Sequence, residues 1–239
     1  MKIAVVGNGK MGTMLSGLIE KDDSLTLAGM IGEGDLDTLD EALPCDVIID
    51  FSYPGNLAMI LEYAVRTGTP AVIGTTGFDE AQEQTIREAA KTVPVVHANN
   101  FSLGVNVMQK LVRDAAKALK GFDIEVVETH HRMKKDAPSG TAKTLIRCAD
   151  PDGEKECVYG RSGMPGARPD REIGVHSLRG GTVAGEHSVY FFGDLEEVEI
   201  RHRADSREIF ARGALVAAQF ATEAKPGYYD MEDVLFGEE

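Results

Sequence analysis

Residues 2–12 read KIAVVGNGKMG, and this stretch decides the fold of the first part of the chain. KIAVV is a short apolar run of the kind that a buried parallel strand shows. The glycine pattern GxGxxG follows at once, and apolar residues then recur at helical spacing up to Ile19. Glycines between a strand and a helix permit a tight turn and let the backbone approach a pyrophosphate. The stretch therefore predicts a dinucleotide-binding turn; a glycine-rich turn without a ligand is the alternative.

The same order of strand, turn and helix continues to about residue 102. Short apolar runs predict strands at 25–31, 46–50, 71–73 and 93–98, and apolar stripes at helical spacing predict helices at 57–65 and 104–119. Strict alternation of strands and helices is typical of an α/β domain with a doubly wound parallel sheet. We therefore expect a Rossmann-like first domain.

Two features follow predicted strands at the sheet edge where open parallel sheets bind ligands. Glu33 lies about 20 positions beyond Gly12, the offset expected for an acid that binds the adenosine ribose. A carboxylate there favours NAD and repels a 2′-phosphate, although Lys10 in the glycine loop softens the exclusion of NADP. The turn at 74–77 reads GTTG and closes the strand 71–73. A surface acid and a plain turn are the alternatives.

The pattern changes in the second part of the chain. Residues 171–179, 188–192 and 196–203 look like alternating strands without intervening helices, residues 157–169 look like a long loop, and residues 207–221 look helical. We expect a second α+β domain with a mixed or antiparallel sheet, and a tail at 228–236 that returns to the first domain. The expected division is 1–102 with 212–239 for dinucleotide binding, and 103–211 for substrate binding.

A basic loop lies between a predicted strand and a predicted helix in the second domain. Residues 125–142 read EVVETHHRMKKDAPSGTA, and the basic residues within this stretch are His130, His131, Arg132, Lys134 and Lys135. Pro138 disfavours helix at the residue before it, so the cluster is expected on a loop. Ser139 or Thr141 would cap the following helix, whose free N–H groups favour a carboxylate or phosphate. The alternative is a solvated loop before an ordinary helix.

Composition limits the partners of this loop. Lys and Arg total 25 and Asp and Glu total 39, so the net charge is −14 and the chain is a poor binder of nucleic acid or anionic membranes. A small anion is therefore the expected partner. Three cysteines without a CxxC pair fit the reducing cytoplasm and predict no metal site, and we see no signal peptide or membrane span. His176, His187 and His202 are interpreted as structural or interface residues.

The two domains together predict reduction of a small anionic carbonyl or imine, with a nearby Lys or His as proton donor. At this point the sequence resembles the 4-hydroxy-tetrahydrodipicolinate reductase (dihydrodipicolinate reductase) family. The resemblance rests on the glycine loop at 7–12, GTTG at 74–77, NNFSLGVN at 99–106, ExHHRxKxDAPSGT at 128–141, HSLRGG ending at Gly181, GEH at 185–187 and YYDMEDVL at 228–235. These motifs span nearly the whole chain in order.

The resemblance implies a function and a set of roles. The family reduces the cyclic imine formed from 4-hydroxy-tetrahydrodipicolinate to tetrahydrodipicolinate with NADH, NADPH or both, in diaminopimelate and lysine biosynthesis. His130 corresponds to its acid/base histidine and Lys134 to its proton donor. The corresponding substrate contacts are His131, Ser139, Gly140, Thr141 and Thr76. The corresponding cofactor contacts are Gly7, Asn8, Gly9, Lys10, Met11, Gly12, Glu33, Gly74, Thr75, Thr76, Ala98, Asn99, Asn100 and Phe101. The family is usually a homotetramer built through the second domain's sheet.

The chain departs from the commoner family pattern in the short form of its glycine loop, in the brief segment 32–44, and in the lack of an Arg after Glu33. The last departure leaves the choice between NADH and NADPH open, with NADH or dual use favoured. Two other functions compete. Another two-domain dehydrogenase, such as a homoserine or aspartate dehydrogenase, would not need the paired histidines with Lys and SGT. A non-catalytic NAD-binding redox sensor would not need an imine-protonating Lys134.

Overall fold

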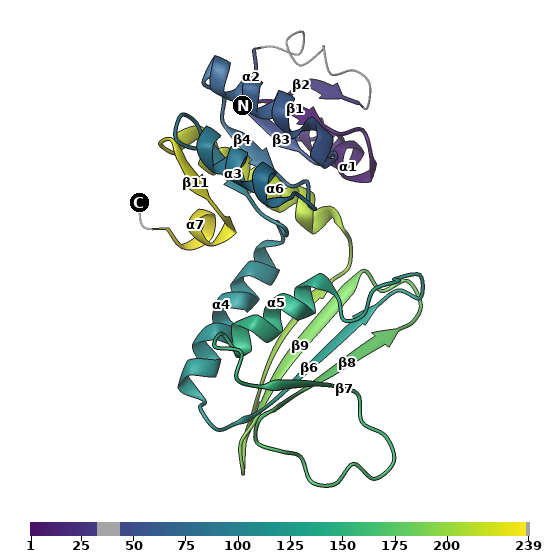
Figure 1. The fold of residues 1–239 in the computed structure, drawn as a ribbon. Helices are drawn as coiled ribbons and strands as arrows, with labels where there is room; N and C mark the ends of the chain where they lie inside the picture. The colour runs from purple at the N-terminus through teal and green to yellow at the C-terminus, as the bar shows by residue number, and fades with distance from the viewer. Residues whose placement is uncertain (33–43, 238–239) are drawn as a thin grey trace. The chain divides into compact units, whose positions relative to one another are not determined.

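The computed structural model describes residues 1–32 and 44–237, so Glu33 and most of the segment 32–44 lie outside the described residues. The chain divides into two compact units. The first contains Met1–Leu103 and Glu208–Glu239, and the second contains Gly104–Arg207. Each unit has its own sheet and its own helices (Figure 1).

The first unit is built on a parallel sheet. Among the described residues its strands lie in the order β11-β5-β4-β3-β1-β2, and every neighbouring pair is parallel. The strands are β1 (Lys2–Val6), β2 (Thr26–Ile31), β3 (Val47–Asp50), β4 (Ala71–Ile73), β5 (Pro94–His97) and β11 (Gly227–Tyr229). Since β1 lies between β2 and β3, the winding reverses at β1, and ligands bind at the carboxyl ends of strands beside such a reversal.

Helices cover both faces of this sheet, which explains why its central strands are apolar throughout. The helical elements are α1 (Lys10–Ile19), the short 3₁₀ turn η2 (Pro54–Asn56), α2 (Leu57–Thr67), α3 (Glu80–Ala89), α6 (Glu208–Glu223) and α7 (Met231–Phe236). Helices α2 and α3 pack in one core with Ala4 and Val6 of β1. Helices α1, α6 and α7 pack in the other core with Ile3 and Val5, because successive side chains of a strand point to opposite faces.

The second unit is a mixed sheet. Its strands lie in the order β10-β9-β6-β8-β7, with β6 parallel to β8, β7 parallel to β8, and antiparallel pairs at β6–β9 and β9–β10. They are β6 (Asp123–His130), β7 (Glu156–Tyr159), β8 (Glu172–Arg179), β9 (Gly185–Phe192) and β10 (Glu197–Ala204). Helices α4 (Leu103–Ala118) and α5 (Gly140–Ala149) supply the apolar side chains that cover one face of this sheet.

The predicted fold class is confirmed, with a Rossmann-like parallel sheet and a second, mixed sheet. The predicted tail returns as expected, because β11 pairs with β5. One prediction is wrong: the long loop predicted at 157–169 begins with β7, which pairs in parallel with β8. Cys157, Val158 and Tyr159 favour a strand, and the loop starts only at Gly160, whose φ of +77° suits glycine.

Candidate active site

The glycine turn after β1 contains two glycines that the backbone requires and one that it does not. Gly7 has a φ of +109°, and a Cβ there would lie 2.3 Å from the carbonyl oxygen of Phe51. A Cβ on Gly12 would lie 1.8 Å from the carbonyl oxygen of Gly7. At Gly9, which caps α1, no heavy atom of the described residues beyond Gly9 and its two chain neighbours lies within 4 Å of such a Cβ. The turn therefore leaves an open cradle at a helix N-terminus, and this fits a pyrophosphate.

The loops after β1, β3 and β4 are tied together at this edge. The N–H of Ser52 donates to Asp50 Oδ1 at 3.0 Å and to Thr75 Oγ1 at 2.8 Å. A Cβ on Gly74 would lie 2.5 Å from the ring of Phe51, so this ring packs on bare backbone. Asp50 is 1% exposed, and its burial raises its pKa against the opposing effect of hydrogen bonds from Ser52 and Thr75. The loop that carries Phe51 and Ser52 thus contacts the turns after β1 and β4, and none of its residues is among the predicted site residues.

The other predicted cofactor residues occupy the same edge or its turns. Phe101 is 1% exposed, and its ring meets the Phe51 ring edge to face at 5.7 Å. Asn100 Oδ1 accepts a hydrogen bond of 2.9 Å from the N–H of Ser102. The remaining predicted contacts lie in the turns after β1, β4 and β5 or at the start of α1: Asn8, Lys10, Met11, Thr76, Ala98 and Asn99. Glu33 lies outside the described residues.

On the second unit, the inner face of the sheet changes from apolar to polar along its strands. One cross-strand row, in the order β8-β6-β9-β10, consists of Val175, Val126, Val189 and Ile200. Two residues further along, the next row in the same order consists of Ser177, Glu128, His187 and His202. Glu128 and His187 are only 0% and 4% exposed, so the middle of this polar row is buried at the end of an apolar core, whereas Ser177 is exposed.

Glu128 is the centre of the buried polar row. Its carboxylate accepts hydrogen bonds from Arg179 Nη1 and Nη2 at 2.9 and 2.6 Å, and from the N–H of Ser139 at 3.2 Å. His130 Nδ1 lies 2.5 Å from Glu128 Oε2. Burial alone would raise the pKa of Glu128, but hydrogen bonds from Arg179, Ser177 and His130 outweigh it and lower the pKa to about 2. The carboxylate is therefore ionised throughout the physiological pH range.

Two histidine rings lie against each other beside this carboxylate. The rings of His130 and His187 meet edge to face, with centroids 5.2 Å apart. Burial lowers the pKa of His130 against the pull of Glu128, and burial together with His130 lowers the pKa of His187 to about 4. A Cβ on Gly185 would lie 3.1 Å from His130 Nε2, so the missing side chain leaves room for the imidazole. Burial therefore favours the uncharged form of both rings.

The start of α5 joins the same cluster. Ser139 is the N-cap: its Oγ accepts from the N–H of Ala142 at 3.1 Å and lies 2.9 Å from His187 Nε2. Of the two predicted caps, Ser139 is therefore the one used. Gly140 and Thr141 form the first turn, where backbone N–H groups point away from the helix.

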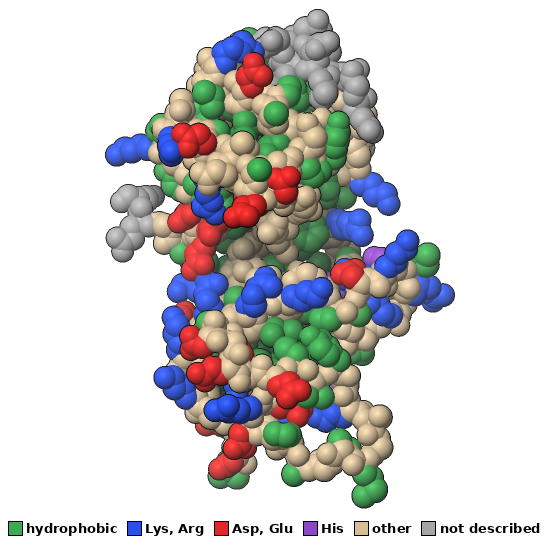
Figure 2. Space-filling model, viewed as in Figure 1, with side chains coloured by type: hydrophobic (Ala, Val, Ile, Leu, Met, Phe, Trp, Pro, Cys, Tyr) green, Lys and Arg blue, Asp and Glu red, His purple; other side chains and the backbone are tan. Residues whose placement is uncertain are grey.

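The basic loop is held by backbone hydrogen bonds to the turn between β8 and β9. The N–H of His131 donates to the Val183 carbonyl at 2.8 Å, and the N–H of Arg132 donates to the Gly181 carbonyl at 3.3 Å. Lys134 Nζ lies 3.0 Å from Asp136 Oδ1, and its side chain is 20% exposed. Figure 2 shows Lys and Arg side chains gathered beside a histidine on the surface of the second unit. The loop presents cations next to the helix start.

The structure thus brings together six predicted site residues of the second unit: His130, His131, Lys134, Ser139, Gly140 and Thr141. Thr76 belongs to the first unit. Glu128, Arg179 and His187 were not among the predicted site residues, and His187 had been interpreted as structural or interface. Their motifs, ExHH, HSLRGG and GEH, were the available signal. Only the strand register shows that these three meet.

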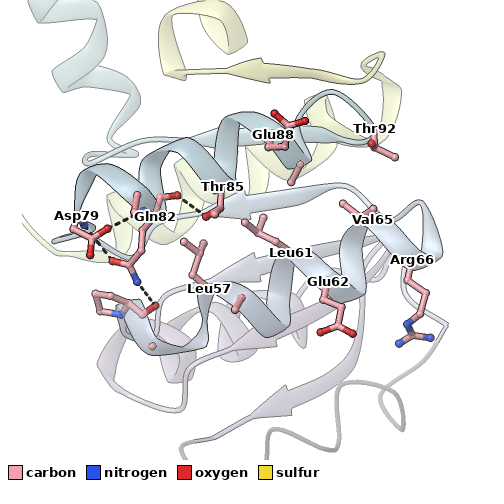
Figure 3. Close-up of a pocket in the computed structure, with 15 residues that line it drawn as sticks. Leu57, Leu61, Glu62, Val65, Arg66, Asp79, Gln82, Thr85, Glu88 and Thr92 are labelled. Carbon is pink, nitrogen blue, oxygen red and sulfur yellow. Dashed lines mark hydrogen bonds between the residues drawn. The ribbon is translucent and has the colours of Figure 1, made fainter.

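A groove of about 910 Å³ lies elsewhere on the first unit, between α2 and α3. Figure 3 shows Leu57, Leu61 and Val65 of α2 on one side and Gln82, Thr85 and Glu88 of α3 on the other. It is lined by none of the predicted site residues. Within the described part of the chain, no group of three His, Cys, Asp or Glu residues is arranged to hold a metal ion.

Comparisons with known proteins agree with the site and the fold. Residues 1–101 match the family "Dihydrodipicolinate reductase, N-terminus", and residues 104–235 match "Dihydrodipicolinate reductase, C-terminus". The chain belongs to the dihydrodipicolinate reductase family. The resemblance inferred from the motifs is therefore confirmed. Family membership also implies a pyridine nucleotide as cofactor.

Relatives match over nearly their full length. The 4-hydroxy-tetrahydrodipicolinate reductase of Methanocorpusculum labreanum is 43% identical over 98% of this chain and 99% of its own. The enzyme of the same name from Brachyspira hyodysenteriae is 44% identical over 98% of this chain and 100% of its own. A solved structure of dipicolinate-bound dihydrodipicolinate reductase from Paenisporosarcina sp. TG-14 has a TM-score of 0.82 at 25% identity, covering 98% of this chain and 99% of that one.

More distant structures share the fold. C. glutamicum DAP dehydrogenase in complex with DAP has a TM-score of 0.58 at 17% identity, covering 100% of this chain and 96% of that one. This likeness shows the architecture alone. Among the helices of the described residues, none has the length and apolarity that a membrane crossing requires.

Proposed function

We propose that the protein reduces the cyclic imine derived from 4-hydroxy-tetrahydrodipicolinate to tetrahydrodipicolinate with NAD(P)H, in diaminopimelate and lysine biosynthesis. The observation that carries this proposal is near full-length similarity to 4-hydroxy-tetrahydrodipicolinate reductases, such as the enzyme that is 44% identical over 98% of the chain. The cluster around His130, with Lys134 and the start of α5, supports it because these groups suit an anionic substrate that must be protonated.

The substrate carries two carboxylates, and the second unit offers two kinds of anion partner. The first turn of α5, at Gly140 and Thr141, presents backbone N–H groups and the positive end of a helix dipole. His131 and Lys134 add side chains from the basic loop. Ser139 holds this turn in place as N-cap, and dipicolinate, which also has two carboxylates, is bound in the Paenisporosarcina reductase structure. We assign these residues, together with Thr76 of the first unit, to substrate binding.

Reduction of an imine also needs a proton. When bound, the nicotinamide supplies the hydride. We assign Lys134 as the group that donates the proton to the substrate nitrogen, because a primary ammonium on the basic loop is both a hydrogen-bond donor and a counter-charge for the carboxylates. Its Nζ lies 3.0 Å from Asp136 Oδ1, which orients the ammonium. We assign His130 as the acid/base group that exchanges protons beside it.

The cradle at Gly9 and the neighbouring loops would hold the dinucleotide in the first unit. Gly7 and Gly12 shape the turn, Gly9 leaves the space for the pyrophosphate, and Thr75 and Phe101 lie at the same edge. We infer that NADH is used, alone or with NADPH, because Glu33 follows the glycine motif at the ribose-binding offset and no Arg follows it. Glu33 itself lies outside the described residues.

We also propose a cytoplasmic homotetramer assembled through the outer face of the second sheet. Tyr190 and Phe192 stack on this face with ring centroids 5.6 Å apart and an interplanar angle of 5°. Phe192 is 37% exposed and Leu178 is 48% exposed, so the face offers apolar surface for association. Light scattering of the purified protein tests this: a mass of one chain at micromolar concentration would contradict it.

The proposed activity is tested by following NADH and NADPH oxidation with freshly generated substrate. Lys134→Ala should lower kcat by about 10²-fold or more and leave cofactor binding intact, since it removes the proton donor and a counter-charge of the substrate but no group of the dinucleotide cradle. Lys117→Ala, an exposed lysine in the last turn of α4, is the matched control and should behave like the unchanged protein. Unaltered turnover of Lys134→Ala would remove this residue from the mechanism, and no oxidation of either nucleotide would refute the function.

A further inference from the structure

We infer that Glu128 is a positioning residue that fixes the tautomer and ring orientation of His130, so that Nε2 is the nitrogen that exchanges protons. The inference deepens the proposed function and rests on its assignment of His130 as the acid/base group. It follows from what each nitrogen of the ring meets and from how Glu128 itself is held.

The Nδ1 side of the ring is committed to Glu128. His130 Nδ1 lies 2.5 Å from Glu128 Oε2, and an ionised carboxylate only accepts hydrogen bonds. Nδ1 must therefore carry the hydrogen of the neutral ring, and Nε2 must carry the lone pair. The other tautomer would set two lone pairs against each other at this distance. A carboxylate in this position also stabilises the imidazolium once Nε2 has taken up a proton.

Glu128 cannot turn away, because each of its oxygens accepts at least two hydrogen bonds. Oε1 accepts from Arg179 Nη2 at 2.6 Å and from the N–H of Ser139 at 3.2 Å. Oε2 accepts from His130 Nδ1 and from Arg179 Nη1 at 2.9 Å. The side chain of Ser177 is a further hydrogen-bond donor to Glu128, so donors surround the carboxylate. Arg179 is fixed in turn, since Nη2 also donates to the Asp136 carbonyl at 2.9 Å.

The bond from Ser139 links this carboxylate to the proposed substrate site. Ser139 caps α5, whose first turn we assign to the substrate carboxylates. The same carboxylate therefore fixes both the acid/base ring and the helix start. A shift of Glu128 would move the two together, so the distance between proton exchange and anion binding is set by one buried group.

The Nε2 side of the ring is left clear of its neighbouring strand. Gly185 on β9 lies beside it, and a Cβ there would come within 3.1 Å of Nε2. His187 packs edge-on against the ring, and its Nε2 is turned to Ser139 Oγ at 2.9 Å. The charged and titratable groups that act on His130 are Glu128 on its own strand, Arg179 on β8, His187 on β9 and Lys134 on the basic loop.

The unmodified protein supplies the first test. Nitrogen-15 NMR of histidine-labelled protein at pH 8, with the His130 signal assigned by its loss in His130→Asn, reports which ring nitrogen is protonated. We expect the Nδ1–H tautomer at His130. A ring in the Nε2–H form, or in fast exchange between the two forms, would overturn the inference without any variant at Glu128.

The second test uses Glu128→Gln. Arg179 still needs an acceptor, so the Gln oxygen should turn to it and the Gln NH₂ should face Nδ1, which reverses the tautomer. We expect kcat/KM to fall by about 10²-fold or more, with KM for the nucleotide unchanged. The plot of kcat/KM against pH should also lose the limb that reports the titration of His130. Glu156→Gln, on edge strand β7, is the matched control with unchanged kinetics. Retained Nδ1–H and an unchanged pH profile in a folded Glu128→Gln protein would refute the inference.

The two proposals fail in different ways. If His130→Asn turned over substrate normally, the acid/base role of His130 in the proposed function would be wrong. The NMR result would still report whether Glu128 fixes the ring. Should Glu128→Gln not fold, Glu128→Asp provides the kinetic readout: its shorter side chain loses the contact with Nδ1 first, and a wild-type profile there would refute the inference.

Discussion

Single substitutions of three glycines at or near α1 should affect NADH affinity and the stability of the fold separately. Gly12→Ala would place a Cβ 1.8 Å from the Gly7 carbonyl oxygen. Helix and turn must then separate by about 1 Å or more, because the contact is with backbone that has no rotamer to change. We expect a loss of roughly 3 kcal/mol, which lowers the Tm of a protein of this size by roughly 6–12 °C.

Gly9→Ala should behave in the opposite way. Apart from Gly9 and its two chain neighbours, no heavy atom of residues 1–32 and 44–237 lies within 4 Å of a Cβ at this position, and the backbone angles of −75° and −166° suit alanine. The weaker cap and the smaller entropy of the unfolded chain nearly offset each other, so stability should change by less than about 1 kcal/mol. A bound pyrophosphate needs the space that the new methyl group fills. NADH binding should therefore weaken by about 10-fold or more, or roughly 1.4 kcal/mol.

Gly17→Ala is the matched control within the same helix. Beyond the adjoining backbone of α1, it also meets no heavy atom of the described residues within 4 Å, and alanine in a helix interior adds up to about 1 kcal/mol of stability. Thermal unfolding and fluorescence titration with NADH measure both properties for all three variants. Wild-type NADH affinity in Gly9→Ala would refute a pyrophosphate at this turn. An unchanged Tm in Gly12→Ala would refute the packing argument.

Further outcomes are expected at the cofactor edge and in the buried polar row. Glu33→Ala should shift the ratio of kcat/KM toward NADPH, and an unaltered ratio would contradict its ribose role. The folded pKa of His187 is about 4, below its ordinary 6.5, so folding resists protonation of His187 and stability should fall by roughly 3 kcal/mol as pH drops through this window. The pKa of Glu128 is about 2, below its ordinary 4.5, so a second loss should follow between pH 4.5 and 2. Urea unfolding at pH 7, 5 and 3.5 tests both, and equal stability at pH 7 and 5 would refute the first. Asp50→Asn should raise the Tm at pH 7, because burial raises the pKa of this carboxyl and an amide avoids the cost of burying its charge. Asp50→Ala should lower the Tm. A lower Tm for both variants would contradict this reasoning.

Most of the fold was predictable because its signals are local. The run KIAVV became β1 with its predicted bounds, and the strand predicted at 71–73 became β4. Helix α3 was not predicted explicitly, yet it too has a local signal. Asp79 accepts from the N–H of Gln82, and the Gln82 side chain accepts from the N–H of Asp79. This capping box can be read from the two residues alone.

The candidate site was predictable only in part because its partners are brought together by strand register. His130, Lys134 and Ser139 stand close in the sequence, so one motif identifies them. Arg179 lies opposite His130 through the pairing of β6 with β8, and His187 reaches it through the pairing of β6 with β9. A one-residue slip in either pairing would turn these side chains to the other face. No pattern in a single sequence specifies that register.

The first unit is interrupted by the second, and this affects how the protein is made. Its sheet face at Ile3 and Val5 is covered by the alanines of α6, which begins at Glu208. A ribosome adding 5–20 residues each second would need about 5–20 s to synthesise the intervening hundred residues. During that time the apolar residues of this sheet face that α6 will cover stay exposed. The second unit is one continuous segment, Gly104–Arg207, so it can complete its folding before the first unit does.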